Sequence, residues 1–353
     1  MSQAVRRTAF GLAAAWALVA NGSEAQIFVP NAFADAVTVY EYTAAGNDPP
    51  LRTIQGPNTG IDLPFALAVD NEAGELFVAS FSSDTVLVYP LAANGNVVPI
   101  RTKATQSPIG MHVDSRHGEL FVRNFGTQAV SVFKLVGEAP PHRILGGPAT
   151  TIDDNAVDLF VDTLNDELVI ANRSSEDPSE ILFFARTASG DVPPQRAISG
   201  PSTGLLAPYS IYVDAVHDEI FVGDSDSAVR VFDRRASGDV APLRTLELAS
   251  GLVSGVFVDL AHDELFLGIR DNPPGNQRLA VYDREAAGAA QPLRVIAGSA
   301  TGLDYPSILE LRSRQVFADG FETGNTSAWS LVVEEVTTDK EVEGSGTDEG
   351  PRG

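Results

Sequence analysis

The stretch from residue 64 to residue 101 decides the fold. It contains four runs, Pro64-Phe-Ala-Leu-Ala-Val-Asp70, Glu75-Leu-Phe-Val78, Thr85-Val-Leu-Val-Tyr89 and Pro99-Ile-Arg101. The first three runs are short, apolar and rich in Val, Phe and Tyr, and the gaps between the runs hold Gly, Asn, Asp and Ser. Such runs predict β-strands joined by turns. The stretch therefore predicts a unit of four short strands.

The same unit recurs along the chain with a period of about 50 residues. Its most regular mark is a proline, any residue and then an arginine, found at Arg52, Arg101, Arg143, Arg196, Arg244 and Arg294. A Val-Asp pair ends the first run at Asp70, Asp114 and Asp162, and Asp214 and Asp259 repeat it. A repeat of this length with four strands is typical of a propeller blade.

One blade is split between the two ends of the chain. Residues 27–29, 37–40 and 51–54 match the second, third and fourth runs, and residues 306–311 match the first. A shared blade closes the ring and removes open sheet edges. The sequence therefore predicts an all-β, six-bladed β-propeller with four-stranded blades, closed by one C-terminal strand and three N-terminal strands.

The two ends of the chain differ in character from the ring. Residues 1–25 have the features of a secretory signal peptide: Arg6 and Arg7, an apolar run from Ala9 to Ala20, and small residues at Ser23 and Ala25. We expect the propeller to occupy residues 26–320. The C-terminal tail, residues 321–353, is acidic and expected to be disordered after residue 330. The segment from Asp319 to Trp329 resembles a short C-terminal element of secreted bacterial proteins.

Composition restricts the compartment and the partners. The 353 residues include no cysteine, which excludes disulfides, a lipoprotein anchor and thiolate metal sites. A net charge of −23 argues against nucleic acid and anionic membrane surfaces as partners. We expect an exported bacterial protein, periplasmic or extracellular, with no membrane span after signal cleavage. We expect a monomer whose partner is a protein, a glycan or a small molecule.

Alternation along the first strand predicts the side chains of the central channel. The second position before the repeat aspartate is Ala68, His112, Phe160, Tyr212, Phe257 and, in the split blade, Glu310; the fourth is Ala66, Gly110, Asp158, Ser210, Gly255 and Ile308. His112 and Tyr212 are candidate binding residues. Asp158 and Glu310 are candidate ligands for Ca²⁺, which takes six to eight oxygens. The alternative is a wet channel with scattered polar groups.

A second candidate surface is the loop face, where first strands begin and second strands end. Arg123, Arg173 and Arg270 are predicted to lie near this rim, where they could receive an acidic ligand. The neighbouring loops, 173–180 and 270–278, vary between repeats, and binding usually lies in such loops. The repeated arginines, the repeat aspartates and the histidines at 117, 217 and 262 have regular positions that favour structural roles.

The unit formed by residues 208–214, 219–222 and 229–233 resembles an NHL-type or YVTN-type propeller repeat. Relatives of that repeat include the calcium-dependent six-bladed lactonases of the gluconolactonase and SMP-30 (senescence-marker) group. The resemblance implies a propeller, and it implies as one activity a Ca²⁺-dependent, lactonase-like hydrolase or lyase that uses channel carboxylates. The sequence assigns no catalytic residue.

Two functions remain open at this stage. The first is a secreted binding or scaffold protein that recognises a ligand through its loop face or channel mouth. The alternative is the Ca²⁺-dependent lactonase-like enzyme, using Asp158 and Glu310. No cofactor other than this possible Ca²⁺ is expected. A third possibility is a largely structural envelope protein. Its function should be insensitive to substitutions both at the channel carboxylates and in the loops of the loop face.

Overall fold

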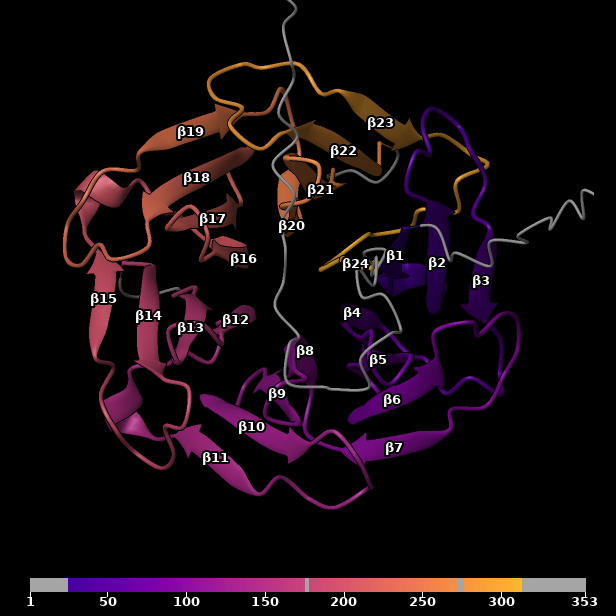
Figure 1. The fold of residues 1–353 in the computed structure, drawn as a ribbon, viewed down its shortest axis with the longest axis horizontal. Coiled ribbons are helices and arrows are strands. Elements are labelled where there is room, and N and C mark those ends of the chain that lie inside the picture. Colours follow the sequence, from indigo (N-terminus) through magenta and orange to yellow (C-terminus); the bar gives the residue numbers. More distant parts are fainter. Residues whose placement is uncertain (1–24, 175–177, 272–275, 313–353) are drawn as a thin grey trace, which may run out of the picture. The chain divides into compact units, whose positions relative to one another are not determined.

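The computed structural model describes residues 25–174, 178–271 and 276–312, which form a six-bladed β-propeller of four-stranded antiparallel sheets (Figure 1). The expected tail, residues 321–353, lies outside the described residues, as do the last eight residues of the expected propeller range and residues 1–24 of the expected signal peptide. None of the helices within the described ranges is long and apolar enough to cross a membrane. The all-β, six-bladed architecture is the one that the repeat predicts.

The strands follow the predicted runs closely. The first two complete blades are β4 (Pro64–Asp70), β5 (Glu75–Ser80), β6 (Thr85–Pro90), β7 (Arg101–Ala104) and β8 (Pro108–Asp114), β9 (Glu119–Asn124), β10 (Ala129–Lys134), β11 (Arg143–Gly146). The next two are β12 (Asp158–Asp162), β13 (Glu167–Asn172), β14 (Glu180–Ala185), β15 (Arg196–Ser199) and β16 (Pro208–Asp214), β17 (Glu219–Asp224), β18 (Ala228–Asp233), β19 (Arg244–Glu247). The last is β20 (Leu252–Asp259), β21 (Glu264–Arg270), β22 (Arg278–Asp283), β23 (Arg294–Ala297). Short 3₁₀ turns occur at Ala32–Ala34, Pro148–Thr150 and Pro201–Thr203.

The remaining blade joins the two ends of the ring. β24 (Glu310–Arg312) pairs antiparallel with β1 (Gln26–Asn31), which pairs with β2 (Ala36–Glu41), and β3 (Arg52–Gln55) completes the sheet. In Figure 1 the yellow β24 lies beside the indigo β1. This confirms closure by one late strand and three early strands.

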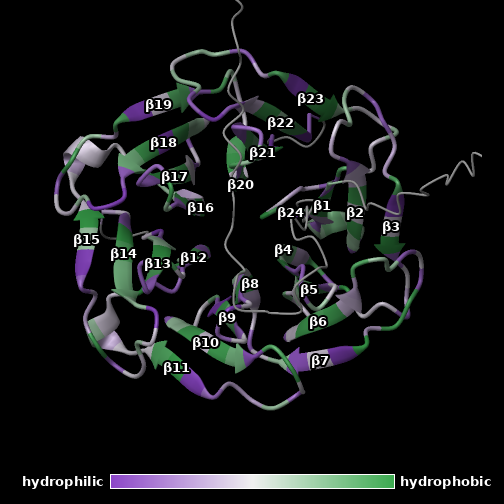
Figure 2. Ribbon diagram, in the orientation of Figure 1, coloured by the Kyte–Doolittle hydropathy of each residue, from purple (hydrophilic) through white to green (hydrophobic). Residues whose placement is uncertain are grey.

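The hydrophobic core lies between neighbouring blades. The third residue before each repeat aspartate is 3% exposed or less: Leu67, Met111, Leu159, Ile211 and Val256. In Figure 2 the third strand of each blade is largely green, which marks hydrophobic residues. The outermost strands, each of which begins at a repeated arginine, carry purple, hydrophilic stretches. Burial of these apolar faces, at about 25 cal/mol per Å² of apolar surface, holds the blades together.

The repeat aspartates hold the hairpins that follow them. Asp214 Oδ1 accepts hydrogen bonds from the amides of Val216 and His217, and the His217 ring bonds its other oxygen. Asp70, Asp114, Asp162 and Asp259 accept bonds from the same turn positions. These bonds confirm the predicted turn role of the aspartates. They also agree with the predicted structural role of the histidines at positions 117, 217 and 262 in these turns.

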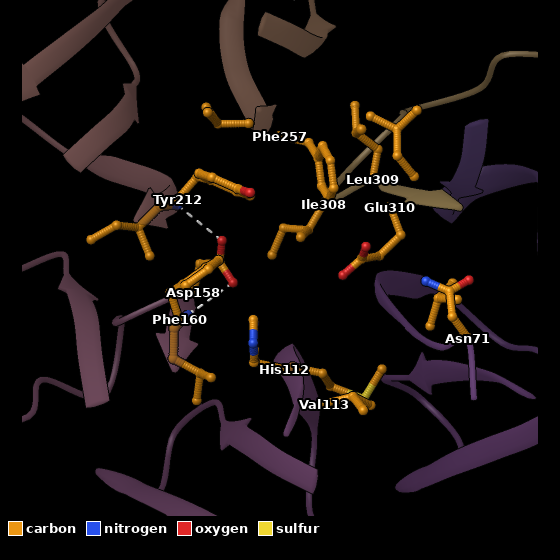
Figure 3. Close-up of a pocket in the computed structure, with 16 residues that line it drawn as sticks. Asn71, His112, Val113, Asp158, Phe160, Tyr212, Phe257, Ile308, Leu309 and Glu310 are labelled. Atoms are coloured by element: carbon orange, nitrogen blue, oxygen red, sulfur yellow. Dashed lines mark hydrogen bonds between the residues drawn. The ribbon is translucent and has the colours of Figure 1, made fainter. Parts of the chain in front are cut away.

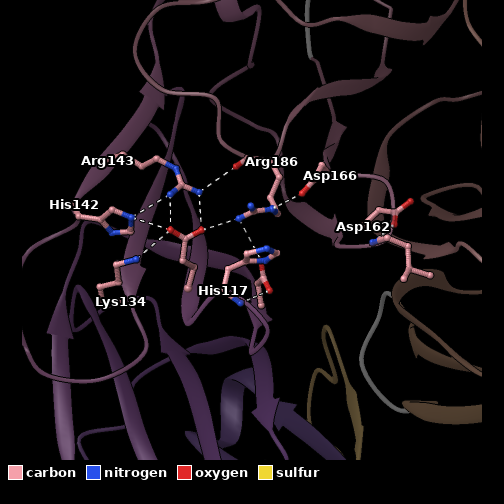
Figure 4. A network of polar contacts seen from close by, with 10 residues as sticks. His117, Lys134, His142, Arg143, Asp162, Asp166 and Arg186 are labelled. Atoms are coloured by element: carbon pink, nitrogen blue, oxygen red, sulfur yellow. Dashed lines mark hydrogen bonds and ion pairs between the residues drawn. The ribbon is translucent and has the colours of Figure 1, made fainter. Parts of the chain in front are cut away.

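The repeated arginines tie the outer edge of each blade. Arg143 makes two hydrogen bonds to Glu119, of 2.6 and 2.9 Å, and donates to a carbonyl of the next blade (Figure 4). Four more pairs repeat this contact: Arg101–Glu75, Arg196–Glu167, Arg244–Glu219 and Arg294–Glu264. In the closing blade Arg52 bonds Gln26 instead. These contacts place the repeated arginines in regular structural positions at the blade edges, as the sequence predicts.

A second arginine links successive blades, and the sequence reasoning missed it. Arg186 reaches back to Glu119 and Asp114 of the preceding blade, at 3.1 and 3.4 Å (Figure 4). Arg234 and Arg284 repeat this contact. All three stand two residues after an aromatic residue of the third strand. That spacing was the available signal.

Candidate functional site

The central channel is closed at the fourth position of the first strands. Residues 66, 110, 158, 210, 255 and 308 are all buried. The carboxylate of Asp158 accepts a hydrogen bond from the Ile211 amide, and the Ser210 hydroxyl accepts one from the Val256 amide, each at 3.0 Å. A Cβ atom at Gly110 would lie 2.5 Å from the Val157 carbonyl oxygen, so only glycine fits there. The first strands therefore close the channel at this level.

The channel widens at the second position, toward the ends of the first strands. A cavity of about 250 Å³ lies there, and it gathers four of the predicted residues: His112, Asp158, Tyr212 and Glu310. Figure 3 shows these four side chains directed toward one open centre, with Asn71 at its margin. We call this cavity the channel pocket. Since Asp158 belongs to the closed level, it lies at the floor of the channel pocket.

One side of the channel pocket is aromatic. The rings of His112 and Phe160 are 4.4 Å apart between centroids. Similar centroid distances separate the Phe160 ring from that of Tyr212, 4.9 Å, and the Tyr212 ring from that of Phe257, 5.2 Å. Four successive blades thus supply a continuous wall of rings. Glu310 lies across the cavity from this wall (Figure 3).

Burial governs the charge of the channel pocket. It raises the pKa of Glu310 to about 8, and the nearby Asp158 charge adds to the rise. Burial also raises the pKa of Asp158 to about 7, against the hydrogen bonds from Ile211 and Leu159. It lowers the pKa of His112 to about 4. Burial disfavours every charged form. At neutral pH the histidine is therefore neutral, Glu310 is largely protonated and Asp158 is about half protonated, and a bound cation could displace these protons.

The residues of the channel pocket fit a calcium centre poorly. Asp158 already accepts bonds from the Leu159 amide, the Ser210 hydroxyl and the Ile211 amide. Within the described ranges, no group of three or more acidic or histidine side chains is arranged to hold a metal ion. Calcium takes six to eight oxygen ligands. Two carboxyl groups, one of them occupied by hydrogen bonds, supply few of these.

The structure separates the three predicted rim arginines. Arg123 is 0% exposed and donates hydrogen bonds to the backbone carbonyls of Asn124, Ala129 and Asp153. Its guanidinium group therefore binds the protein's own backbone rather than facing a ligand at the rim. Arg173 and Arg270 instead both pack against one ring, that of Tyr209. The loops 173–180 and 270–278 are only partly described.

Two tyrosines complete this second region, and the sequence reasoning did not select them. Tyr209 follows Pro208 at the start of β16, and Tyr305 precedes Pro306, which lies four residues before β24 begins. Arg270 packs over both rings, at 5.3 Å from the Tyr209 centroid and 4.2 Å from that of Tyr305. We call Arg173, Tyr209, Arg270 and Tyr305 the arginine rim. An aromatic residue next to the leading proline was the available signal.

Comparison with known proteins supports the fold. No protein-family model matches the chain, and no curated protein matches it. A nidogen/laminin complex contains a similar structure, with a TM-score of 0.61 and 12% identity over 81% of this chain and 98% of that one. A functionally unknown protein from Desulfotomaculum acetoxidans DSM 771 is also similar, with a TM-score of 0.53 and 11% identity over 78% of this chain and 80% of that one. At such low identity these likenesses show the propeller fold alone.

Proposed function

We propose that this propeller is a binding protein, and that the channel pocket receives a small organic cation. The observation that carries the proposal is the pairing of an aromatic wall, from His112 to Phe257, with the carboxyl group of Glu310 across a cavity of about 250 Å³. Aromatic faces attract cations, and a carboxylate supplies the opposing charge. A binding or scaffold role is compatible with the fold.

The charge of Glu310 gives this proposal a pH signature. Because the pKa of Glu310 is about 8, the free pocket must release a proton before the carboxylate can pair with a cation. Below that pKa the ionised fraction grows about tenfold for each pH unit. Affinity for an amine or quaternary ammonium ligand should therefore increase from pH 6 to pH 8.

Calorimetric titration with choline and with benzylamine tests the proposal. We expect binding at pH 8 that weakens at pH 6, and that weakens at least about tenfold in the Glu310→Gln variant, which removes the charge and keeps the shape. A matched control is Glu72→Gln, an exposed acid that should leave affinity unchanged. Binding that is equal in both variants would contradict the assignment of the channel pocket.

A second proposal is the Ca²⁺-dependent, lactonase-like hydrolase or lyase implied by the resemblance to the NHL-type and SMP-30 propellers. Its supporting observation is that Asp158 and Glu310 line one cavity, and water or substrate oxygens would have to supply most of the remaining calcium ligands. Elemental analysis of the purified mature chain, before and after chelation, separates the proposals. About one Ca²⁺ per chain, lost in Asp158→Ala and Glu310→Ala, supports the second; chains without stoichiometric calcium contradict it.

We further propose that the protein is secreted, periplasmic or extracellular. The first described strand begins at Gln26, immediately after the expected cleavage position. N-terminal sequencing of the exported chain should read from Gln26. An N-terminus at residue 1 in the exported fraction would contradict this proposal.

A further inference from the structure

Arg270 is a buried cation with no acidic partner among the residues that the structure describes. It is 6% exposed at the end of β21, and none of the described carboxylates forms an ion pair with it. Its polar neighbours are the phenols of Tyr209 and Tyr305 and a second cation, Arg173. Buried charges in folded proteins are normally paired, because desolvation strongly disfavours an isolated ion.

Arg173 increases this excess of positive charge. Its guanidinium lies 4.8 Å from the centroid of the Tyr209 ring and donates to the Tyr209 hydroxyl at 2.7 Å. None of the described acids pairs with it either. Acids outnumber bases in this chain by 47 to 24, and a buried arginine such as Arg230 is paired with two of them, Asp224 and Asp226. Two neighbouring arginines that pair with none of the described acids are therefore a local exception.

An aromatic arc continues from the arginine rim along the loop face. Tyr305 stacks on Phe33 at 4.2 Å, and Phe33 is 55% exposed. Further ring contacts join Tyr305 to Phe65, Phe65 to Phe81, and Phe81 to Phe125. The pairing of Pro208 with Asp224 and of Leu252 with Arg270 shows that first strands begin where second strands end. The arc and the arginine rim thus share the face opposite the channel pocket.

We infer that the arginine rim is a binding site for an organic carboxylate. The carboxylate would pair with Arg270 and Arg173, since guanidinium groups bind carboxylates strongly and with two hydrogen bonds. The ring or apolar body attached to the carboxylate would lie along the aromatic arc. A uronate residue of a glycan and a free aromatic acid both have this chemistry. The site is separate from the channel pocket and does not depend on the proposal made for it.

The stability of a charge-removing variant tests the site without a ligand. Arg270→Met keeps apolar packing against the tyrosines and removes a buried charge that none of the described acids pairs with, so the midpoint of thermal unfolding should stay constant or rise. The matched control is Arg230→Met, which leaves the buried Asp224 carboxylate without its arginine partner. This variant should lower the midpoint by about 5 °C or more. An equal loss in both variants would show that Arg270 is paired within the chain, and it would overturn the inference.

Titration calorimetry at low salt tests the ligand class. The probes are benzoate, an oligogalacturonate, the neutral galactose oligomer and inorganic phosphate. We expect at least one carboxylate to bind, and to bind at least about tenfold more weakly in Arg270→Met and in Arg173→Met. Preference for the oligomer identifies a glycan source, and preference for benzoate identifies a free acid. The neutral oligomer should not bind.

Three results would overturn the inference. They are no binding of either carboxylate to the unmodified protein, unchanged binding in both arginine variants, and phosphate binding as tight as that of the carboxylates. Glu72→Gln serves as the matched control, since Glu72 is an exposed acid outside the arginine rim and its loss should leave carboxylate binding unchanged.

Discussion

At the residue scale, Glu310 shows how the ring alters one side chain. A glutamate at this position of β24 faces a narrow channel and the Asp158 carboxyl group, so its pKa rises to about 8. An unfolded chain restores a pKa of about 4.3. Between these values the folded chain keeps a proton that the unfolded chain has lost. The free energy of unfolding therefore falls as the pH rises through this window.

The expected slope can be measured against a neutral variant. Glu310 should contribute a loss of at most about 1.4 kcal/mol per pH unit between about pH 5 and pH 8. Glu310→Gln removes the titration, so its unfolding midpoint should fall less than that of the unmodified protein over this range. Thermal unfolding followed by circular dichroism at pH 5 and pH 8 gives the comparison. Parallel curves for the two proteins would show that Glu310 is ionised in the folded state throughout.

At the element scale, the edge of each blade is fixed by charge as well as by the ladder of hydrogen bonds. Burial alone would raise the pKa of Glu119, but hydrogen bonds and charge from Arg143, together with His142, lower it to about 2. Arg143 also reaches a carbonyl of the next blade. The pair therefore joins a second strand, a fourth strand and a neighbouring sheet.

Removal of one partner should reveal this coupling. Arg143→Ala removes two hydrogen bonds from Glu119, which keeps Arg186 and His142 as partners, and the loss of unfolding free energy should be about 2 kcal/mol. Urea denaturation measures it. Arg116→Ala, at an exposed turn, should change stability by no more than about 0.5 kcal/mol. Similar effects for the two variants would mean that the Arg143–Glu119 pair contributes little beyond surface charge.

The sequence predicted these elements better than the sites that they form. Alternation along a strand correctly predicts that residues 112, 158, 212 and 310 face the channel, because it depends only on backbone geometry. It says nothing about the width of the channel, which close contacts such as that at Gly110 decide. The burial of Arg123 and the stacking of Arg270 on two tyrosines also depend on neighbouring blades. Distances between blades are not encoded in the pattern of one strand.

At the scale of the whole molecule, stability depends on closure. Each blade packs its faces against two neighbours, so the split blade completes the two cores that lie on either side of it. β24 supplies the first strand of that blade, and Leu309 and Leu311 pack in its core with Ile27 and Val29. The backbone of Ile308 also bonds the carbonyl of Phe65 in the neighbouring blade. A short C-terminal segment therefore determines whether the ring is sealed.

Truncation should separate closure from the contribution of the tail. A chain ending at residue 304 lacks β24, which exposes the edge of β1 and the apolar residues it covers. Since exposed strand edges pair with other chains, we expect a lower unfolding midpoint and soluble aggregates in size-exclusion chromatography. A chain ending at residue 320 keeps the whole propeller and should match the full-length protein in both measurements. If the shorter chain remained monomeric and equally stable, the ring would not need β24, and closure by the split blade would not be the source of stability.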